Sequence, residues 1–103
     1  MFSKKDRLSR EDFPIALKTG RRRSSPHFLI LFPEGVRGYA VVIPKKIVRL
    51  SSARHLLKRQ IIEAIRSLPL PASLVIFPRS SVRGVHYEDI QAELSTLIAQ
   101  NRA

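Results

Sequence analysis

The sequence has 103 residues, enough for one domain around a single hydrophobic core and too few for two domains of ordinary size. Lys and Arg number 19 against 8 Asp and Glu, and this net charge of +11 favours a nucleic acid over an acidic protein or a membrane surface. The absence of cysteine excludes disulfides and thiolate metal sites, and the basic N-terminal residues lead into no apolar run. We therefore expect one cytoplasmic domain over residues 1–103, without signal peptide or membrane span.

The N-terminal part of the chain reads as a polar segment followed by a helix. Residues 1–8 are polar, and we expect a flexible segment that becomes held when it meets a partner. A helix is expected to begin near Ser9, with Asp12 three residues later, and to stop at Gly20. Pro14 is tolerable there only because it lies close to the first turn, where few backbone N–H groups have partners. The apolar stripe of this helix is Phe13, Ala16 and Leu17.

Two short apolar runs, residues 28–32 and 39–43, predict strands. The first run is continuous, which suits a strand covered on both faces, and the second is rich in β-branched and aromatic residues. Gly35 and Gly38 lie in the short loop between them, so an antiparallel hairpin is the simplest pairing. A short extra strand around residues 22–25 is a further expectation.

The second half of the chain predicts a helix, a strand and a helix. Ser51 or Ser52 can cap the first of these helices, which should end after Leu68. Residues 74–77 form a third apolar run, and because it follows a helix it suits a parallel strand-helix-strand unit with residues 39–43. A final amphipathic helix is expected over the apolar positions Tyr87, Ile90, Leu94, Leu97 and Ile98.

Successive residues 100° apart divide the middle helix into an apolar arc and a basic arc. The apolar arc consists of Ala53, Leu57, Ile61, Ala64, Ile65 and Leu68. Ile62 falls within the basic arc, so we expect its side chain to be exposed. Ten Lys or Arg lie between Gly35 and Gly84 against one acid, Glu63. The residues that suit RNA phosphates are Lys45, Lys46, Arg49, Arg54, His55, Lys58, Arg59 and Arg66. Charge alone is equally compatible with a merely solvated surface.

Several short motifs in this sequence occur together, with similar spacing, in one protein family. Residues 7–20 contain R-L-x-x-x-D-F followed by Gly. The predicted strand at residues 39–43 leads into the pair Lys45 and Lys46. The segment RHLLKRQIIE at residues 54–63 compares with the pattern R-N-x-x-K-R-x-x-R-E. Together these motifs resemble the bacterial ribonuclease P protein subunit over almost the whole chain. The departures are His55 for the Asn, Ile62 for the second Arg and Leu17 for an aromatic residue of the first helix.

The resemblance implies an α+β fold, an α/β sandwich like ribosomal protein S5 domain 2. The implied element order is α-β-β-(β)-α-β-α, with a left-handed crossover between the parallel strands. In that family an RNA subunit removes the 5′ leader of precursor tRNA, and the protein binds this RNA through the basic motif. The leader lies in a cleft between the first helix and the sheet. The residues that we assign to this cleft are Phe13, Phe28, Tyr39, Arg21, Arg22 and Arg23.

Phe13 and Phe28 have a second explanation, because their spacing alone favours ordinary core residues, and only the resemblance favours base stacking. We expect no catalytic residue and no protein metal site, since His27, His55 and His86 are scattered along the chain. We expect the acids Glu88, Asp89 and Glu93 to lie on the outer face of the last helix.

Magnesium is the expected cofactor of the resembled enzyme, held mainly by RNA phosphates. The expected partners are the ribonuclease P RNA and precursor tRNA, in a complex of one protein monomer with one RNA. Two alternatives stay open: a ribosomal or other structural RNA-binding protein with no role in cleavage, and a stand-alone nuclease.

Overall fold

Four strands form one mixed sheet in the computed structural model, which describes residues 6–101. They are β1 (Arg21–Ser24), β2 (Phe28–Phe32), β3 (Gly38–Val41) and β4 (Ser73–Pro78), in the spatial order β1-β2-β4-β3. β2 runs antiparallel to both β1 and β4, whereas β3 and β4 run parallel. The predicted extra strand is therefore confirmed as β1, and the predicted parallel unit as β3 and β4.

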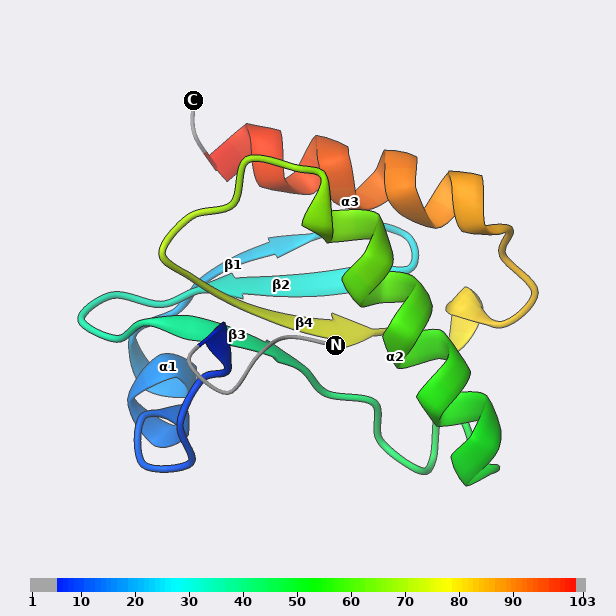
Figure 1. The fold of residues 1–103 in the computed structure, drawn as a ribbon, viewed down its shortest axis with the longest axis horizontal. Coiled ribbons are helices and arrows are strands. Elements are labelled where there is room, and N and C mark those ends of the chain that lie inside the picture. The colour runs from blue at the N-terminus through cyan, green and yellow to red at the C-terminus, as the bar shows by residue number, and fades with distance from the viewer. Residues whose placement is uncertain (1–5, 102–103) are drawn as a thin grey trace.

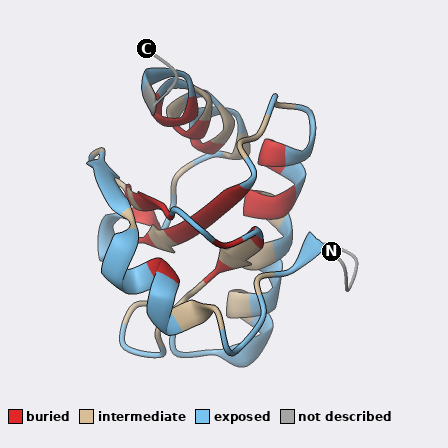
Figure 2. Ribbon diagram, turned by 90° about the vertical axis from the view of Figure 1, so that its left-hand side faces the viewer, coloured by how far each residue is buried: buried red, intermediate tan, exposed pale blue. Residues whose placement is uncertain are grey.

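Helices cover both faces of this sheet (Figure 1). α2 (Ser51–Arg66) and α3 (Tyr87–Asn101) lie on one face, and the short α1 (Phe13–Thr19) lies on the other. A 3-10 turn, η2 (Ser80–Val82), joins β4 to α3. Figure 2 shows that the buried residues concentrate in the sheet and on the inward sides of the helices. The order α-β-β-β-α-β-α and the α+β class agree with the prediction.

The expected hairpin between β2 and β3 is wrong, because β4 lies between these two strands. Ile30 of β2 is opposite Ile76 of β4, and Val41 of β3 is opposite the same residue on its other side. A one-strand gap is about 10 Å wide, and the five residues between β2 and β3 can span roughly 16 Å. The loop length therefore allows either arrangement, and the strongly apolar β2 and β4 take the central positions, where both neighbours are strands.

The connection from β3 through α2 to β4 is left-handed, as the family resemblance implied. β3 and β4 both run from left to right in Figure 1, β4 lies above β3, and α2 lies on the viewer's side of the sheet. When the strands are turned to point upward, β4 lies to the left of β3 behind the helix. This hand is rare, since about 98% of such crossovers are right-handed.

The core divides into two clusters because successive strand residues point to opposite faces. Ile30 and Ile76 face α2 and α3, whereas Leu31 and Val75 face α1. The larger cluster is Phe28, Ile30, Phe32, Val41, Ile61, Ile62, Ala64, Ile65, Leu74, Ile76, Val82, Ile90, Leu94, Leu97 and Ile98. The smaller cluster is Ala16, Leu31, Val36 and Val75. With only one short helix over it, the second face of the sheet is covered less completely.

Both predicted helix caps lie elsewhere. α1 begins at Phe13 rather than near Ser9, whose backbone and side-chain oxygens instead accept a turn hydrogen bond from the Asp12 N–H. Pro14 then falls in the first helical turn, where its missing N–H costs least, as expected. In α2 the N-cap position is Leu50, so the two serines after it are the first helical residues and neither caps the helix. α2 also ends at Arg66, two residues earlier than predicted.

Glu93 faces inward from α3, so its prediction as an outer-face residue is wrong. One carboxylate oxygen accepts hydrogen bonds from the Ser25 hydroxyl and from the His27 backbone N–H, the latter at 2.8 Å. Ser25 and His27 belong to the turn between β1 and β2. Glu93 therefore fastens this turn to α3, because a carboxylate that accepts two bonds at a partly buried site is held strongly.

Ile62 is a core residue, so its predicted exposure is also wrong. Its side chain is 2% exposed and belongs to the larger cluster, next in sequence to the buried Ile61. α2 packs against both α3 and β3, and this double contact widens the buried arc beyond one stripe. The other apolar positions predicted for α2 are buried or half-buried.

We predict that Ile62→Arg destabilises the fold. The change removes buried apolar contacts and introduces a charge, which typically costs about 2 kcal/mol or more. For a domain of this size the melting temperature should fall by roughly 8 °C or more. Leu56→Arg on the same helix is the matched control, because Leu56 is 56% exposed and its replacement should change stability by under about 0.5 kcal/mol. Equal melting temperatures for the two variants would contradict the burial of Ile62.

Candidate nucleic-acid interface

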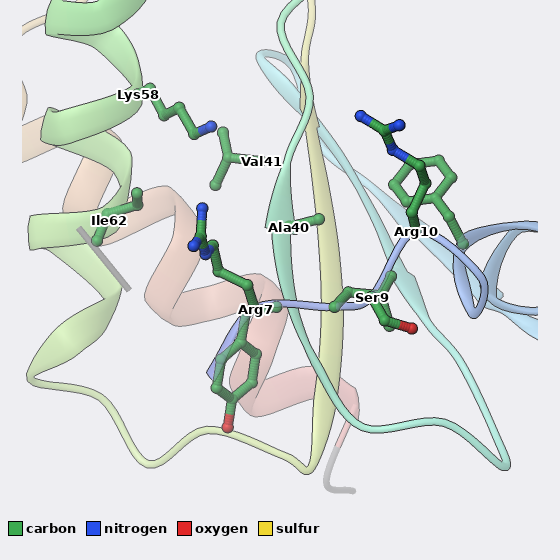
Figure 3. A pocket seen from close by; sticks show the side chains of 10 residues that line it. Arg7, Ser9, Arg10, Ala40, Val41, Lys58 and Ile62 are labelled. Carbon is green, nitrogen blue, oxygen red and sulfur yellow. The ribbon is translucent and has the colours of Figure 1, made fainter. Parts of the chain in front are cut away.

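A groove of about 510 Å³ runs along the outer edge of β3, between the N-terminal segment and α2 (Figure 3). It is lined by Arg7, Leu8, Ser9, Arg10, Phe13, Tyr39, Ala40, Val41, Lys58 and Ile62. Three of these residues are cations and none is an acid. The sequence predicted Lys58 as an RNA-binding residue, whereas Arg7 was named only as part of the family motif and Arg10 was not named.

The N-terminal segment forms one wall of the groove because it adds to the edge of β3. The Leu8 N–H donates a 3.0 Å hydrogen bond to the Tyr39 carbonyl, and Arg7 pairs with Tyr39 in a parallel bridge. Gly38 permits this close approach: its φ is +114°, and a Cβ there would lie 2.7 Å from the Leu8 nitrogen. The expectation of a loosely held segment is therefore wrong for Arg7 and Leu8, while residues 1–5 lie outside the described residues.

The groove bends around the edge of β3. Arg7 and Lys58 both direct their charged groups into the space between α2 and β3 (Figure 3). Arg10 lies on the other side of β3, toward α1 (Figure 3). Ile62 and Val41 are 2% and 8% exposed and form the floor at the α2 end. The groove thus joins the basic surface of α2 to the face of the sheet that carries α1.

The basic residues predicted for RNA binding gather on α2 and on the segment before it. His55, Arg59 and Arg66 are exposed on the helix, and Lys58 is half-buried at the groove. Arg66 forms a 3.6 Å ion pair with Glu63, so a carboxylate of the same helix partly balances its charge. The remaining exposed cations, Lys45, Lys46 and Arg49, lie in the segment that leads into α2.

Arg54 differs from the other members of the basic motif because its side chain turns back toward the chain. Its Nη1 donates to the Val48 carbonyl at 3.0 Å and to the Arg49 carbonyl at 2.7 Å. The side chain is half-buried, unlike that of Arg59 five residues later. Arg54 therefore fixes the segment that presents Arg49 and the Lys45–Lys46 pair.

The aromatic residues predicted for the leader cleft separate onto different sides of the sheet. Phe28 has no exposed surface and packs under α2 and α3, so it is a core residue and its prediction as a stacking residue is wrong. Phe13 is half-buried over the smaller cluster on the α1 side. Tyr39 packs against the larger cluster, and its hydroxyl donates a 2.7 Å hydrogen bond to the Pro71 carbonyl. Phe77, which the sequence did not single out, is half-buried on the same side as Phe13.

The three arginines of β1 are exposed, but they do not share one face. Arg22 is opposite Leu31 and lies on the α1 side, whereas Arg21 and Arg23 are opposite Phe32 and Ile30 on the α3 side. β1 is also the edge strand farthest from β3. Their prediction as a single cluster in the leader cleft is therefore wrong for Arg21 and Arg23.

Metal ligands do not converge in the described part of the chain: residues 6–101 contain no group of three His, Asp or Glu side chains arranged to hold an ion. Among the same residues, no helix is long and apolar enough to cross a membrane.

The fold resembles that of the ribonuclease P protein from Thermotoga maritima, with a TM-score of 0.80 and 24% sequence identity, covering 91% of this chain and 96% of that one. It is equally similar to a mutant of the Staphylococcus aureus ribonuclease P protein with defective mRNA degradation activity. That comparison has a TM-score of 0.81 and 19% identity, covering 96% of this chain and 90% of the other. At such identities the likeness shows the fold.

The family model for ribonuclease P matches residues 2–102, nearly the whole chain. The chain therefore belongs to the ribonuclease P protein family, whose members are components of the ribonuclease P holoenzyme. A search among curated proteins gave no match.

We predict that Arg54→Ala loosens the segment before α2. Loss of the two carbonyl contacts should raise the hydrogen-exchange rates of the Ile47 and Val48 amides, which bond to the Pro44 carbonyl in the turn that Arg54 braces. Arg59→Ala removes the same charge from an exposed position of the helix and should leave both rates unchanged. Unaltered exchange in Arg54→Ala would mean that Arg54 does not hold the segment.

Proposed function

We propose that the chain is the RNA-binding protein subunit of a bacterial ribonuclease P, which assists removal of the 5′ leader of precursor tRNA. The observation that carries this proposal is the continuous basic surface of α2 and the preceding segment, in a chain of this family. Phosphate contacts from such a surface supply affinity without reading sequence, which suits a structured RNA subunit. We assign the RNA subunit to Lys45, Lys46, Arg49, His55 and Arg59.

The leader of precursor tRNA is assigned to the face of the sheet that carries α1. α1 has seven residues and leaves Phe13 and Phe77 half-buried there, and Leu17 of the same helix is 50% exposed. Aromatic faces bind the unpaired bases of a single strand without demanding a sequence. This assignment replaces Phe28 with Phe77 as the second aromatic residue.

Hydrolysis is assigned to the RNA subunit and its magnesium ions. Magnesium keeps much of its water and binds phosphate oxygens in preference to an all-protein cage, so the RNA phosphates are its natural ligands. Within residues 6–101 no three His, Asp or Glu side chains are grouped to compete for the ion, and Glu93 and Glu63 already bind Ser25, His27 and Arg66. The role of the chain is to hold both RNAs and to reduce the repulsion between them, as a monomer in a 1:1 complex in the cytoplasm.

Reconstitution with a bacterial ribonuclease P RNA tests the proposal. The chain alone should leave precursor tRNA intact, and it should lower the magnesium concentration that the RNA subunit needs for leader cleavage, because its cations neutralise phosphates otherwise screened by the metal. Cleavage by the purified chain without RNA would point to a stand-alone nuclease. A chain that binds ribosomal RNA and leaves the magnesium requirement unchanged would be a structural RNA-binding protein instead.

We also predict that replacing Arg49 and Arg59 together by Ala flattens the salt dependence of binding to the RNA subunit. Each lost phosphate contact removes roughly 0.7 to 0.9 from the slope of log affinity against log salt, so the slope should fall by about 1.4 to 1.8. Both side chains are exposed, and the melting temperature should stay unchanged. Arg83→Ala, on the segment after η2, is the control. If the double variant keeps the full slope, these cations do not contact RNA.

A further inference from the structure

We propose that the α2 end of the groove along β3 is a subsite for one nucleotide of single-stranded RNA. The phosphate would lie between Arg7 and Lys58, and the base would lie against Tyr39 and the apolar floor formed by Val41 and Ile62. This inference rests on the proposed function and adds to it a binding site distinct from the α1 face and from the outer surface of α2.

Among the residues that the structure describes, no carboxylate pairs with the two cations of the subsite. The Arg7 and Lys58 side chains come from different elements and point into the same space (Figure 3). Arg66 and Glu63 form the ion pair within residues 6–101, so no acid among those residues neutralises Arg7 or Lys58. Two cations that converge on one space repel each other, and an anion between them removes that repulsion. A phosphate group meets this requirement with its charge and its several acceptor oxygens.

The floor of the subsite is apolar, which a bare phosphate site does not need. Ile62 stands where the resembled motif has a second Arg, and its side chain closes the bottom of the groove together with Val41. Tyr39 adds a half-buried aromatic ring that its hydroxyl bond to Pro71 holds in place. An apolar floor with an aromatic wall and cations at the rim matches a nucleotide, whose base has flat, apolar faces and whose phosphate is charged.

The size and the course of the groove fit one nucleotide of a longer strand. A volume of about 510 Å³ lies within the range of roughly 300 to 1,000 Å³ for small-ligand sites. The groove continues around the edge of β3 toward Arg10 and Phe13, so a strand can enter from α2 and leave toward the α1 face. The ligand class is therefore single-stranded RNA rather than a free metabolite.

Methyl NMR of the full chain, with 5′-phosphorylated adenine dinucleotide as the probe, tests the subsite. The Ile62 methyl resonances should shift on titration, whereas those of Ile90 and Ile98, buried beneath α3, should not. Arg7→Gln and Lys58→Gln should each raise the dissociation constant at least about fivefold, since each removes a charge-assisted contact. Arg83→Gln removes an equal charge outside the groove and should change it by less than about twofold. Unchanged melting temperatures establish that the variants fold.

Two results would overturn the subsite. One is an Ile62 methyl group that does not respond to the dinucleotide, and the other is equal weakening by Arg7→Gln and Arg83→Gln, which would indicate attraction by net charge alone. Either result combined with normal stimulation of the ribonuclease P RNA rejects the subsite and leaves the proposed function standing. Failure to stimulate the RNA subunit rejects the proposed function itself.

Discussion

The placement of β4 between β2 and β3 is the constraint on which the rest of the structure depends. It makes β3 an edge strand that is parallel to its neighbour, and so requires a helix to return the chain across the sheet. That helix, α2, then lies beside the free edge of β3. The N-terminal segment adds to the same edge at Gly38 and Tyr39, and the space between segment and helix becomes the groove.

The same arrangement separates the molecule into a heavily packed face and a lightly covered face. α2 and α3 bury the larger cluster, and their return path leaves only α1 to cover the other side of the sheet. Phe13 and Phe77 remain half-buried there because seven helical residues cannot shield the whole face. Arg59 and Arg66 of α2 meanwhile point away from the core, which keeps their charges hydrated. The basic surface of α2 and the accessible aromatic surface beside α1 therefore occupy different sides of the sheet, and the groove along the edge of β3 joins them.

Much of this fold follows from local pattern. The apolar run of β2, the existence of β3, α2, β4 and α3, and the basic arc of α2 were all predictable, because burial and exposure impose periods of about two and 3.6 residues. The pairing of β2 with β4 was not predictable, because an apolar run that is covered on both faces does not indicate which strand lies beside it. Phe28 was misplaced for this reason: its face depends on the register with β4.

The contacts of Arg54, Glu93 and Ile62 that the sequence did not predict also have a common cause. Arg54, Glu93 and Ile62 each take their role from a partner that is fixed only in three dimensions. In the sequence Arg54 cannot be distinguished from the other cations of the motif. Its role depends on the two backbone carbonyls of the preceding segment, which lie beside it only in the folded chain. Ile62 looks exposed on an isolated helix, and becomes buried because α2 packs against two neighbours at once. The left-handed crossover came from the family resemblance, since general preference favours the opposite hand.

The central claim is that the two RNAs occupy different faces of one small domain, and directed hydroxyl-radical cleavage tests it most directly. The chain has no cysteine, so Ser52→Cys at the start of α2 and Leu17→Cys on α1 each provide one site for an iron chelate. In the reconstituted holoenzyme with precursor tRNA, the chelate on α2 should cleave the ribonuclease P RNA and the chelate on α1 should cleave the tRNA leader. Glu88→Cys on α3 should cleave neither. Cleavage of the same RNA from both α1 and α2, or of the leader from α2 alone, would contradict the account.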